Sequence, residues 1–175
     1  MEALSGIPLP RGGQHMTTKC PLELRMRRSL KWHASLECSG RLINDNIPNK
    51  QDISVYIHQE QNRLTHHRDQ ISKQALLLNV HAPWLPDLTL IDLPGIIQVT
   101  SKQQDGGSVD AIEELIHEYL DKPSSIILAI IQACNDIETS AAIKYAKKFD
   151  PDGERTSKGI DLFCYSFISL FHNDP

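Results

Sequence analysis

The stretch Leu88-Thr-Leu-Ile-Asp92-Leu-Pro-Gly95 decides the fold of this chain. Its first four residues suit a short buried strand, which places the aspartate and the glycine at the carboxyl end of that strand. An aspartate there can hold a metal, and a glycine leaves its backbone N–H open to a phosphate oxygen. Asp-x-x-Gly is also common in ordinary strand-to-loop turns, so the tetrapeptide alone does not decide between a site and a turn.

Two further apolar runs, at residues 75–80 and 126–131, predict buried strands. The first is separated from residues 88–91 only by a short Pro-containing segment, and we expect those two strands to lie side by side in the sheet. Alternation of apolar and polar residues at 21–26 predicts a half-buried strand after a Pro/Gly loop at 8–14.

Helical periodicity occurs in two segments that alternate with these strands. One helix is expected to begin at Asp110, whose carboxylate can accept from an orphan backbone N–H, and the other at residues 135–138. The expected apolar faces are Ile112, Leu115, Ile116, Tyr119 and Leu120, and Ile137, Ala141, Ala142, Tyr145, Ala146 and Phe149. This alternation predicts an α/β fold with a mostly parallel sheet, flanked by helices and joined by right-handed crossovers.

Residues 29–74 lack this regularity. Residues 38–50 are polar and rich in turn formers, and 51–70 carry a broken helical pattern, so we interpret this segment as a divergent surface excursion. It contains His58, His66 and His67, which have no carboxylate or cysteine at a supporting spacing. We expect solvated histidines there and no metal site.

Length and composition indicate one domain of 175 residues, 40% of them hydrophobic. The net charge of −4 and the pI near 6.0 give no overall positive field, which argues against a nucleic-acid partner. A short basic run, Arg25 to Arg28 with Lys31, is interpreted as a solvated strand end in preference to a phosphate or lipid contact.

The cysteines indicate a reducing, cytoplasmic setting, because they form neither a C-x-x-C pair nor a spacing that suits zinc. They are Cys20, Cys38, Cys134 and Cys164. The sequence shows no secretory leader and no apolar run near the roughly 20 residues that cross a bilayer, so we expect neither secretion nor a membrane span.

A second candidate site is Thr17-Thr18-Lys19-Cys20-Pro21, which follows the loop Pro10-Arg11-Gly12-Gly13. A loop threonine can bind magnesium through its hydroxyl and orient water through its carbonyl when a terminal phosphate is present. On local sequence alone, a loop threonine beside a strand is the commoner explanation.

Five blocks of this sequence, taken in order, resemble the dynamin and Mx-type large GTPases. They are Glu2-Ala-Leu-Ser-Gly6 before the Pro-Arg-Gly loop, Thr18-Lys-Cys-Pro-Leu22, residues 88–96, Ile126-Ile-Leu-Ala-Ile130 and Ala146-Lys-Lys-Phe-Asp-Pro-Asp-Gly-Glu-Arg-Thr156. Five blocks in the same order indicate a family far more specifically than any one block does. The resemblance covers roughly residues 2–156, with 29–74 matching poorly, and implies part of a P-loop-GTPase-like sheet.

The resemblance implies roles for individual residues. Thr18 would be the switch-one threonine, which binds the metal and positions the attacking water, while Asp92 and Gly95 would be the metal-side and phosphate-sensing residues of switch two. The other residues that it places near the nucleotide are Arg11, Gly12, Gly13 and Thr17.

The resemblance also implies a substrate and partners. GTP would be hydrolysed to GDP and phosphate with Mg²⁺, in a cytoplasmic protein. The family further implies self-assembly, association with membranes or microtubules, and membrane remodelling.

Two motifs of such a GTPase are absent from this sequence. No glycine is followed by lysine, so there is no Gly-Lys-Ser/Thr phosphate loop, and we expect the first strand of the sheet to be missing with it. A Thr-Lys-x-Asp guanine-reading motif is also absent, since Ser157-Lys-Gly-Ile-Asp161 is a poor match. We expect the family domain to cover residues 1–156 and a strand-like apolar tail to follow at 157–175.

Two hypotheses remain open at this point. The chain is the central part of a dynamin-type GTPase domain that binds GTP and Mg²⁺. Alternatively, it is a non-catalytic remnant or interaction module that keeps the sheet and binds no nucleotide, because the phosphate loop would supply several charge-assisted hydrogen bonds.

Overall fold

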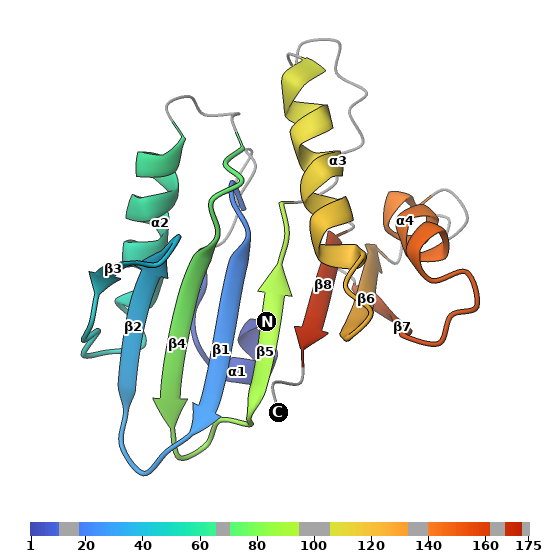
Figure 1. Cartoon of the computed structure of the whole chain (residues 1–175). Helices are drawn as coiled ribbons and strands as arrows, with labels where there is room; N and C mark the ends of the chain where they lie inside the picture. Colours follow the sequence, from blue (N-terminus) through green and yellow to red (C-terminus); the bar gives the residue numbers. More distant parts are fainter. Residues whose placement is uncertain (11–17, 66–70, 95–105, 133–139, 162–166, 173–175) are drawn as a thin grey trace.

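The computed structural model describes residues 1–10, 18–65, 71–94, 106–132, 140–161 and 167–172. Its strands and helices form an α/β fold, as the sequence predicts (Figure 1). The described strands are β1 (Leu22–Arg28), β2 (His33–Cys38), β3 (Arg41–Asn44), β4 (Leu76–Ala82), β5 (Leu88–Asp92), β6 (Ser125–Gln132), β7 (Thr156–Asp161) and β8 (Phe167–His172). The described helices are α1 (Glu2–Ser5), α2 (Ile53–Leu64), α3 (Gly106–Leu120) and α4 (Ala141–Phe149).

These strands form one mixed sheet in the order β3-β2-β4-β1-β5-β8-β6-β7. β1 is parallel to β4 and β6 is parallel to β7, while the other neighbours are antiparallel. The expectation that residues 75–80 and 88–91 form adjacent strands is wrong, because β1 lies between β4 and β5. Residues 83–87 connect β4 to β5 past the end of β1. They are long enough to cover this distance, which is two strand spacings of about 4.8 Å each.

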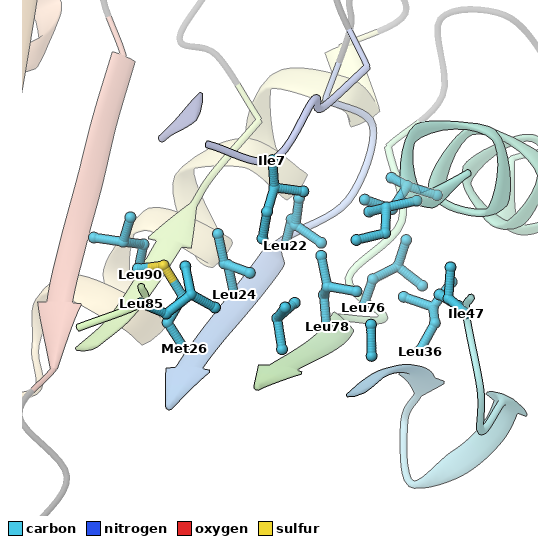
Figure 2. Close-up of a cluster of buried hydrophobic side chains, with 14 of the residues drawn as sticks. Ile7, Leu22, Leu24, Met26, Leu36, Ile47, Leu76, Leu78, Leu85 and Leu90 are labelled. Carbon is cyan, nitrogen blue, oxygen red and sulfur yellow. The ribbon is translucent and has the colours of Figure 1, made fainter. Parts of the chain in front are cut away.

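The two faces of the sheet carry separate hydrophobic cores. Successive residues of a strand point to opposite faces, and the neighbours Leu90 and Ile91 of β5 accordingly belong to different clusters. The cluster around Leu90 packs β1, β2 and β4 against α2 (Figure 2). The cluster around Ile91 packs β5 and β6 against α3 and α4.

Residues 29–74 contribute β2, β3 and α2 to the first of these cores. Ile53 and Ile57 of α2 are fully buried, and β2 pairs with β4 along its whole length, from His33 to Cys38. The sequence does not predict β2 or β3, and for residues 33–38 the reason is that apolar and polar positions contrast too weakly.

The helices agree with the sequence in type and differ in their starts. α3 begins at Gly106, so the prediction that Asp110 caps it is wrong; with no proline before it, the helix extends by a further turn despite its glycines. α4 begins at Ala141, and the expected start at 135–138 lies outside the described residues. α1 ends at Gly6 with φ 65°, as its glycine predicts. None of the described helices is long and apolar enough to cross a membrane.

Arg155 joins the ends of α3 and α4. Its Nη2 donates to the carbonyl of Leu120 at 2.7 Å and to that of Phe149 at 2.9 Å. Its Nη1 donates to the carbonyls of Lys122 at 3.3 Å and Ser125 at 3.2 Å. A cation with several donors satisfies carbonyls that each helix end leaves without a partner. One side chain therefore links the C-terminal ends of the two helices of the second core.

The loop that presents Arg155 is closed by Asp150. Its carboxylate accepts from the hydroxyl of Thr156 and from the backbone N–H groups of Glu154 and Arg155, the latter two at 3.1 Å. The bond from Thr156 is the main cause that lowers the pKa of Asp150 below its ordinary value, and the two backbone bonds add to it. The block at 150–156 thus has a structural role at the far side of β6.

Replacing Arg155 with alanine is expected to lower the free energy of unfolding by about 3 kcal/mol, because four carbonyls lose a charged donor. Urea unfolding followed by circular dichroism measures the change. Lys147→Ala, an exposed position in the last turn of α4, is the matched control and should change stability little. Equal stability of the two variants would contradict this role.

The C-terminal segment enters the middle of the sheet as β8. It is antiparallel to both neighbours, with Ser169 opposite Asp92 of β5 on one side and opposite Leu128 of β6 on the other. β5 and β6 are therefore parallel to each other and separated by one strand (Figure 1). The sequence predicted a strand-like tail but gave no sign of its place in the sheet.

A proline at Ser169 is expected to destabilise the chain by about 3 kcal/mol or more, since every backbone N–H of a strand with two antiparallel neighbours serves the ladder. Ser169→Ala keeps that N–H and is the control. The comparison is made by urea unfolding. A Ser169→Pro variant as stable as Ser169→Ala would show that residues 167–172 do not lie inside the sheet.

Candidate functional site

The antiparallel pairing of β1 with β5 brings two predicted site residues together. Leu22, the first residue of β1, lies opposite Asp92, the last residue of β5. The chain just before β1 therefore passes beside the carboxyl end of β5. There the hydroxyl of Thr18 donates a hydrogen bond to Oδ2 of Asp92 at 2.9 Å, across a separation of 74 residues.

The segment that carries Thr18 is held in place by its neighbours. The backbone N–H of Ser72 donates to the carbonyl of Lys19 at 2.8 Å, and the Lys19 ammonium donates to the side chain of Asn62 at 3.1 Å. Cys20 is fully buried. Sequence reasoning included Lys19 and Cys20 in the second candidate site but gave Asn62 and Ser72 no role, because no residue pattern signals a contact between two distant loops.

Cys20 offers no nucleophile to this site. Burial is the main cause that raises the pKa of its thiol to about 12, and neighbouring Cys38 adds to the shift. A thiol in this environment stays protonated at neutral pH and behaves as a small apolar side chain. Cys20 therefore supplies no thiolate ligand to this edge of the sheet.

Asp92 is held in an environment that disfavours its charge. Burial raises the pKa of its carboxyl from the ordinary 3.8 to about 6, while the hydrogen bond from Thr18 and the positive amino terminus oppose the shift. The carboxylate is ionised at neutral pH at a cost in folding free energy. A cation bound to it would recover that cost.

The two oxygens fit a magnesium ion. They are hard donors of the kind that Mg²⁺ prefers, and their separation of 2.9 Å matches the roughly 2.9 Å between neighbouring ligands of an octahedral Mg²⁺. Two protein oxygens are a normal share, because this ion keeps water and phosphate oxygens as its other ligands. The parts of the chain that the structure describes contain no cluster of three or more acidic, histidine or cysteine residues, so a site closed by protein groups alone is not formed there.

The remaining predicted site residues lie outside the described residues. They are Arg11, Gly12, Gly13, Thr17 and Gly95. Leu93 and Pro94, between Asp92 and Gly95, are both buried and fix the direction in which the chain leaves β5.

Comparison with known proteins decides the family. A sequence model of the Dynamin family matches residues 1–160. This chain belongs to the dynamin family. An interferon-induced GTP-binding protein Mx of Dicentrarchus labrax is 39% identical over 159 residues, which are 89% of this chain and 24% of that protein. An interferon-induced GTP-binding protein Mx1 of Ictalurus punctatus is 38% identical over 190 aligned positions, covering 99% of this chain and 29% of that protein.

These matches confirm the resemblance to the G domain of a dynamin- or Mx-type large GTPase. The dynamin-family chain spans about a quarter of the length of the Mx relatives it matches. Thr18 and Asp92, predicted 74 residues apart as members of one site, lie in hydrogen-bond contact.

Replacing Asp92 with asparagine is expected to raise the free energy of unfolding by about 2 kcal/mol at pH 7.5, with no ligand present. The folded-state pKa lies above the unfolded one, so the wild type loses stability as the pH rises from about 4 to 6. Asparagine keeps the shape and an acceptor for Thr18 without the charge. Urea unfolding of both proteins across this range measures the difference, which should vanish below pH 4. A difference in stability that does not depend on pH would contradict the raised pKa of Asp92.

Proposed function

We propose that this chain carries the two switch regions of a domain that binds and hydrolyses GTP with Mg²⁺. The observation that supports this most directly is the Thr18–Asp92 hydrogen bond of 2.9 Å at the carboxyl end of β5. Ligands of α/β sheets bind at such strand ends. The Mx relatives, which are named as GTP-binding proteins, support guanine nucleotide as the ligand class.

In this proposal each residue has a separate task. Asp92 supplies a negative oxygen to the metal, and Thr18 supplies its hydroxyl oxygen to the metal and its carbonyl to the attacking water. The bound ion, for its part, neutralises charge on the phosphate oxygens. The neighbours proposed to lie around the phosphates are Arg11, Gly12, Gly13, Thr17 and Gly95.

For the protein as a whole, the proposal is based only on similarity to its relatives. We assign residues 1–156 to the GTPase domain, in a cytoplasmic protein that self-assembles. Association with membranes or microtubules, and membrane remodelling, belong to the same proposal. This chain spans about a quarter of the length of those relatives, so these properties are proposed for the whole protein.

The second candidate function is a non-catalytic interaction module that keeps this sheet. The observation in its favour is that none of the nine glycines is followed by lysine, because that dipeptide belongs to the loop that cradles phosphates. The two functions differ in one measurable property, the affinity for Mg·GTP.

Titration of the purified chain with a fluorescent GTP analogue and Mg²⁺ tests the proposal. We expect saturable binding in the micromolar range that requires Mg²⁺ and is weakened about tenfold or more in Asp92→Ala, which loses a charged ligand. Thr18→Val should weaken binding too, and Thr18→Ser should restore it by returning the hydroxyl.

Asp121→Ala is the matched control, since Asp121 is an exposed carboxylate in the turn after α3. It should bind as the wild type does. The absence of saturable binding up to millimolar nucleotide would refute GTP binding by this chain and leave the interaction module.

A further inference from the structure

The last turn of α2 carries buried polar side chains that no proposal above uses. α2 ends at the edge of the sheet where β1 begins (Figure 1), beside residues 18–20. We propose that Gln61 of α2 is a positioning residue, which holds residues 18–20 through Cys20 and so keeps Thr18 against Asp92. The importance of this position for GTP rests on the function proposed above, whereas the contact itself needs no nucleotide.

Gln61 occupies a position where an apolar residue would be ordinary. Ile53, Ile57 and Gln61 follow one another at intervals of four residues, which places them on one face of the helix. The two isoleucines are fully buried and Gln61 is 3% exposed. Burying an amide costs free energy unless its polar atoms have partners. A polar side chain at this position therefore points to a contact that an apolar one cannot make.

The polar contact of Gln61 is with the segment that carries Thr18. The Gln61 side chain forms a hydrogen bond with the thiol of Cys20, which opposes the rise in the pKa of this thiol that burial causes. Cys20 follows Thr18 by two residues, and two residues of extended chain span at most about 7 Å. A displacement of Cys20 therefore also moves Thr18, whose hydroxyl has to stay within hydrogen-bond distance of Asp92.

Gln61 is itself held in place. Its carbonyl accepts two hydrogen bonds from Thr65, one from the hydroxyl at 2.8 Å and one from the backbone N–H at 3.2 Å. Thr65 is buried, so these bonds close the end of the helix inside the protein. Glu60 is buried as well and pairs with Arg63, with 2.6 Å between Oε2 and Nε. The last turn of α2 is therefore a fixed support for a neighbouring segment.

A second contact between α2 and residues 18–20 lies at the surface. The Lys19 ammonium donates to the side chain of Asn62 at 3.1 Å. Asn62 is exposed, and water competes for exposed hydrogen bonds. The contact of Gln61 is made with a fully buried thiol, where a hydrogen bond is stronger. We therefore assign the positioning role to Gln61 and not to Asn62.

Thiol labelling tests the contact without nucleotide. Cys20 and Cys38 both lie in the first core, where they are 0% and 3% exposed. Each should react with N-ethylmaleimide only when the structure around it opens. Mass spectrometry of the digested full chain gives the two labelling rates separately. Opening of the whole core raises both rates, whereas release of residues 18–20 raises the rate of Cys20 alone.

Gln61→Leu keeps a buried side chain of similar size but removes its polar atoms. We expect this variant to label Cys20 about tenfold faster than the wild type and Cys38 at an unchanged rate, because only residues 18–20 lose a hydrogen bond. The matched control is Ile57→Ala, one turn earlier on the same helix face, which leaves a cavity in the core and should raise both rates. Unchanged labelling of Cys20 in Gln61→Leu, or equal increases at Cys20 and Cys38, would refute the positioning role.

Nucleotide affinity tests whether Gln61 acts through Thr18. A double-mutant cycle compares GTP-analogue binding by Gln61→Leu, Thr18→Val and the double variant. We expect Gln61→Leu to weaken binding about threefold in the wild-type background and to change it little once Thr18 has lost its hydroxyl. Equal effects in both backgrounds would show that Gln61 does not act through Thr18. If the wild type binds no nucleotide, the proposed function fails, while thiol labelling still decides whether Gln61 holds residues 18–20.

Discussion

The pairing of β1 on both of its edges is the constraint on which this structure depends. β1 is parallel to β4 on one side and antiparallel to β5 on the other. Because β1 and β4 are parallel, residues 29–75 must return the chain to the starting end of β1. These residues form β2, β3 and α2, and β2 and β3 extend the sheet beyond β4. The antiparallel pairing puts the start of β1 beside the end of β5. One strand therefore positions both the first core and the Thr18–Asp92 pair.

Strands could be predicted from the sequence where apolar residues occupy successive positions. Residues 75–80, 88–91 and 126–131 are nearly continuous apolar runs, and all three are strands. Which strands are neighbours in the sheet could not be predicted in the same way. Apolar runs carry no information on which neighbour a strand takes, so β1, with its weaker alternation, was not expected between β4 and β5. β2 was missed because its exposed and buried positions differ little in polarity.

The order of the motifs predicted Thr18 and Asp92 as members of one site, and the structure shows that the two residues are in contact. Neither Thr18 nor Asp92 could be distinguished from a turn residue on local sequence, and their contact is visible only once β1 and β5 pair. The block at 150–156 shows the opposite case. It is one of the five blocks that resemble the family, yet Asp150 closes its own loop at 150–156 and Arg155 joins the ends of α3 and α4. The described contacts of this family motif therefore stabilise the fold.

The position of β8 constrains the chemistry that this edge can support. β5 and β6 are parallel, and Asp92 of β5 lies two strand spacings, or about 10 Å, from Leu128 of β6, because both are opposite Ser169. β6 continues beyond Leu128 to Gln132. A parallel strand between them would end at the same edge and could lead into a loop that faces Asp92, as phosphate loops do. β8 is antiparallel and starts there instead, with Ser169 opposite Asp92. In the proposed function, the phosphates of a nucleotide held through Thr18 and Asp92 would meet the first residues of β8. Nucleotide affinity would then depend on residues 167–172 as well as on Thr18 and Asp92.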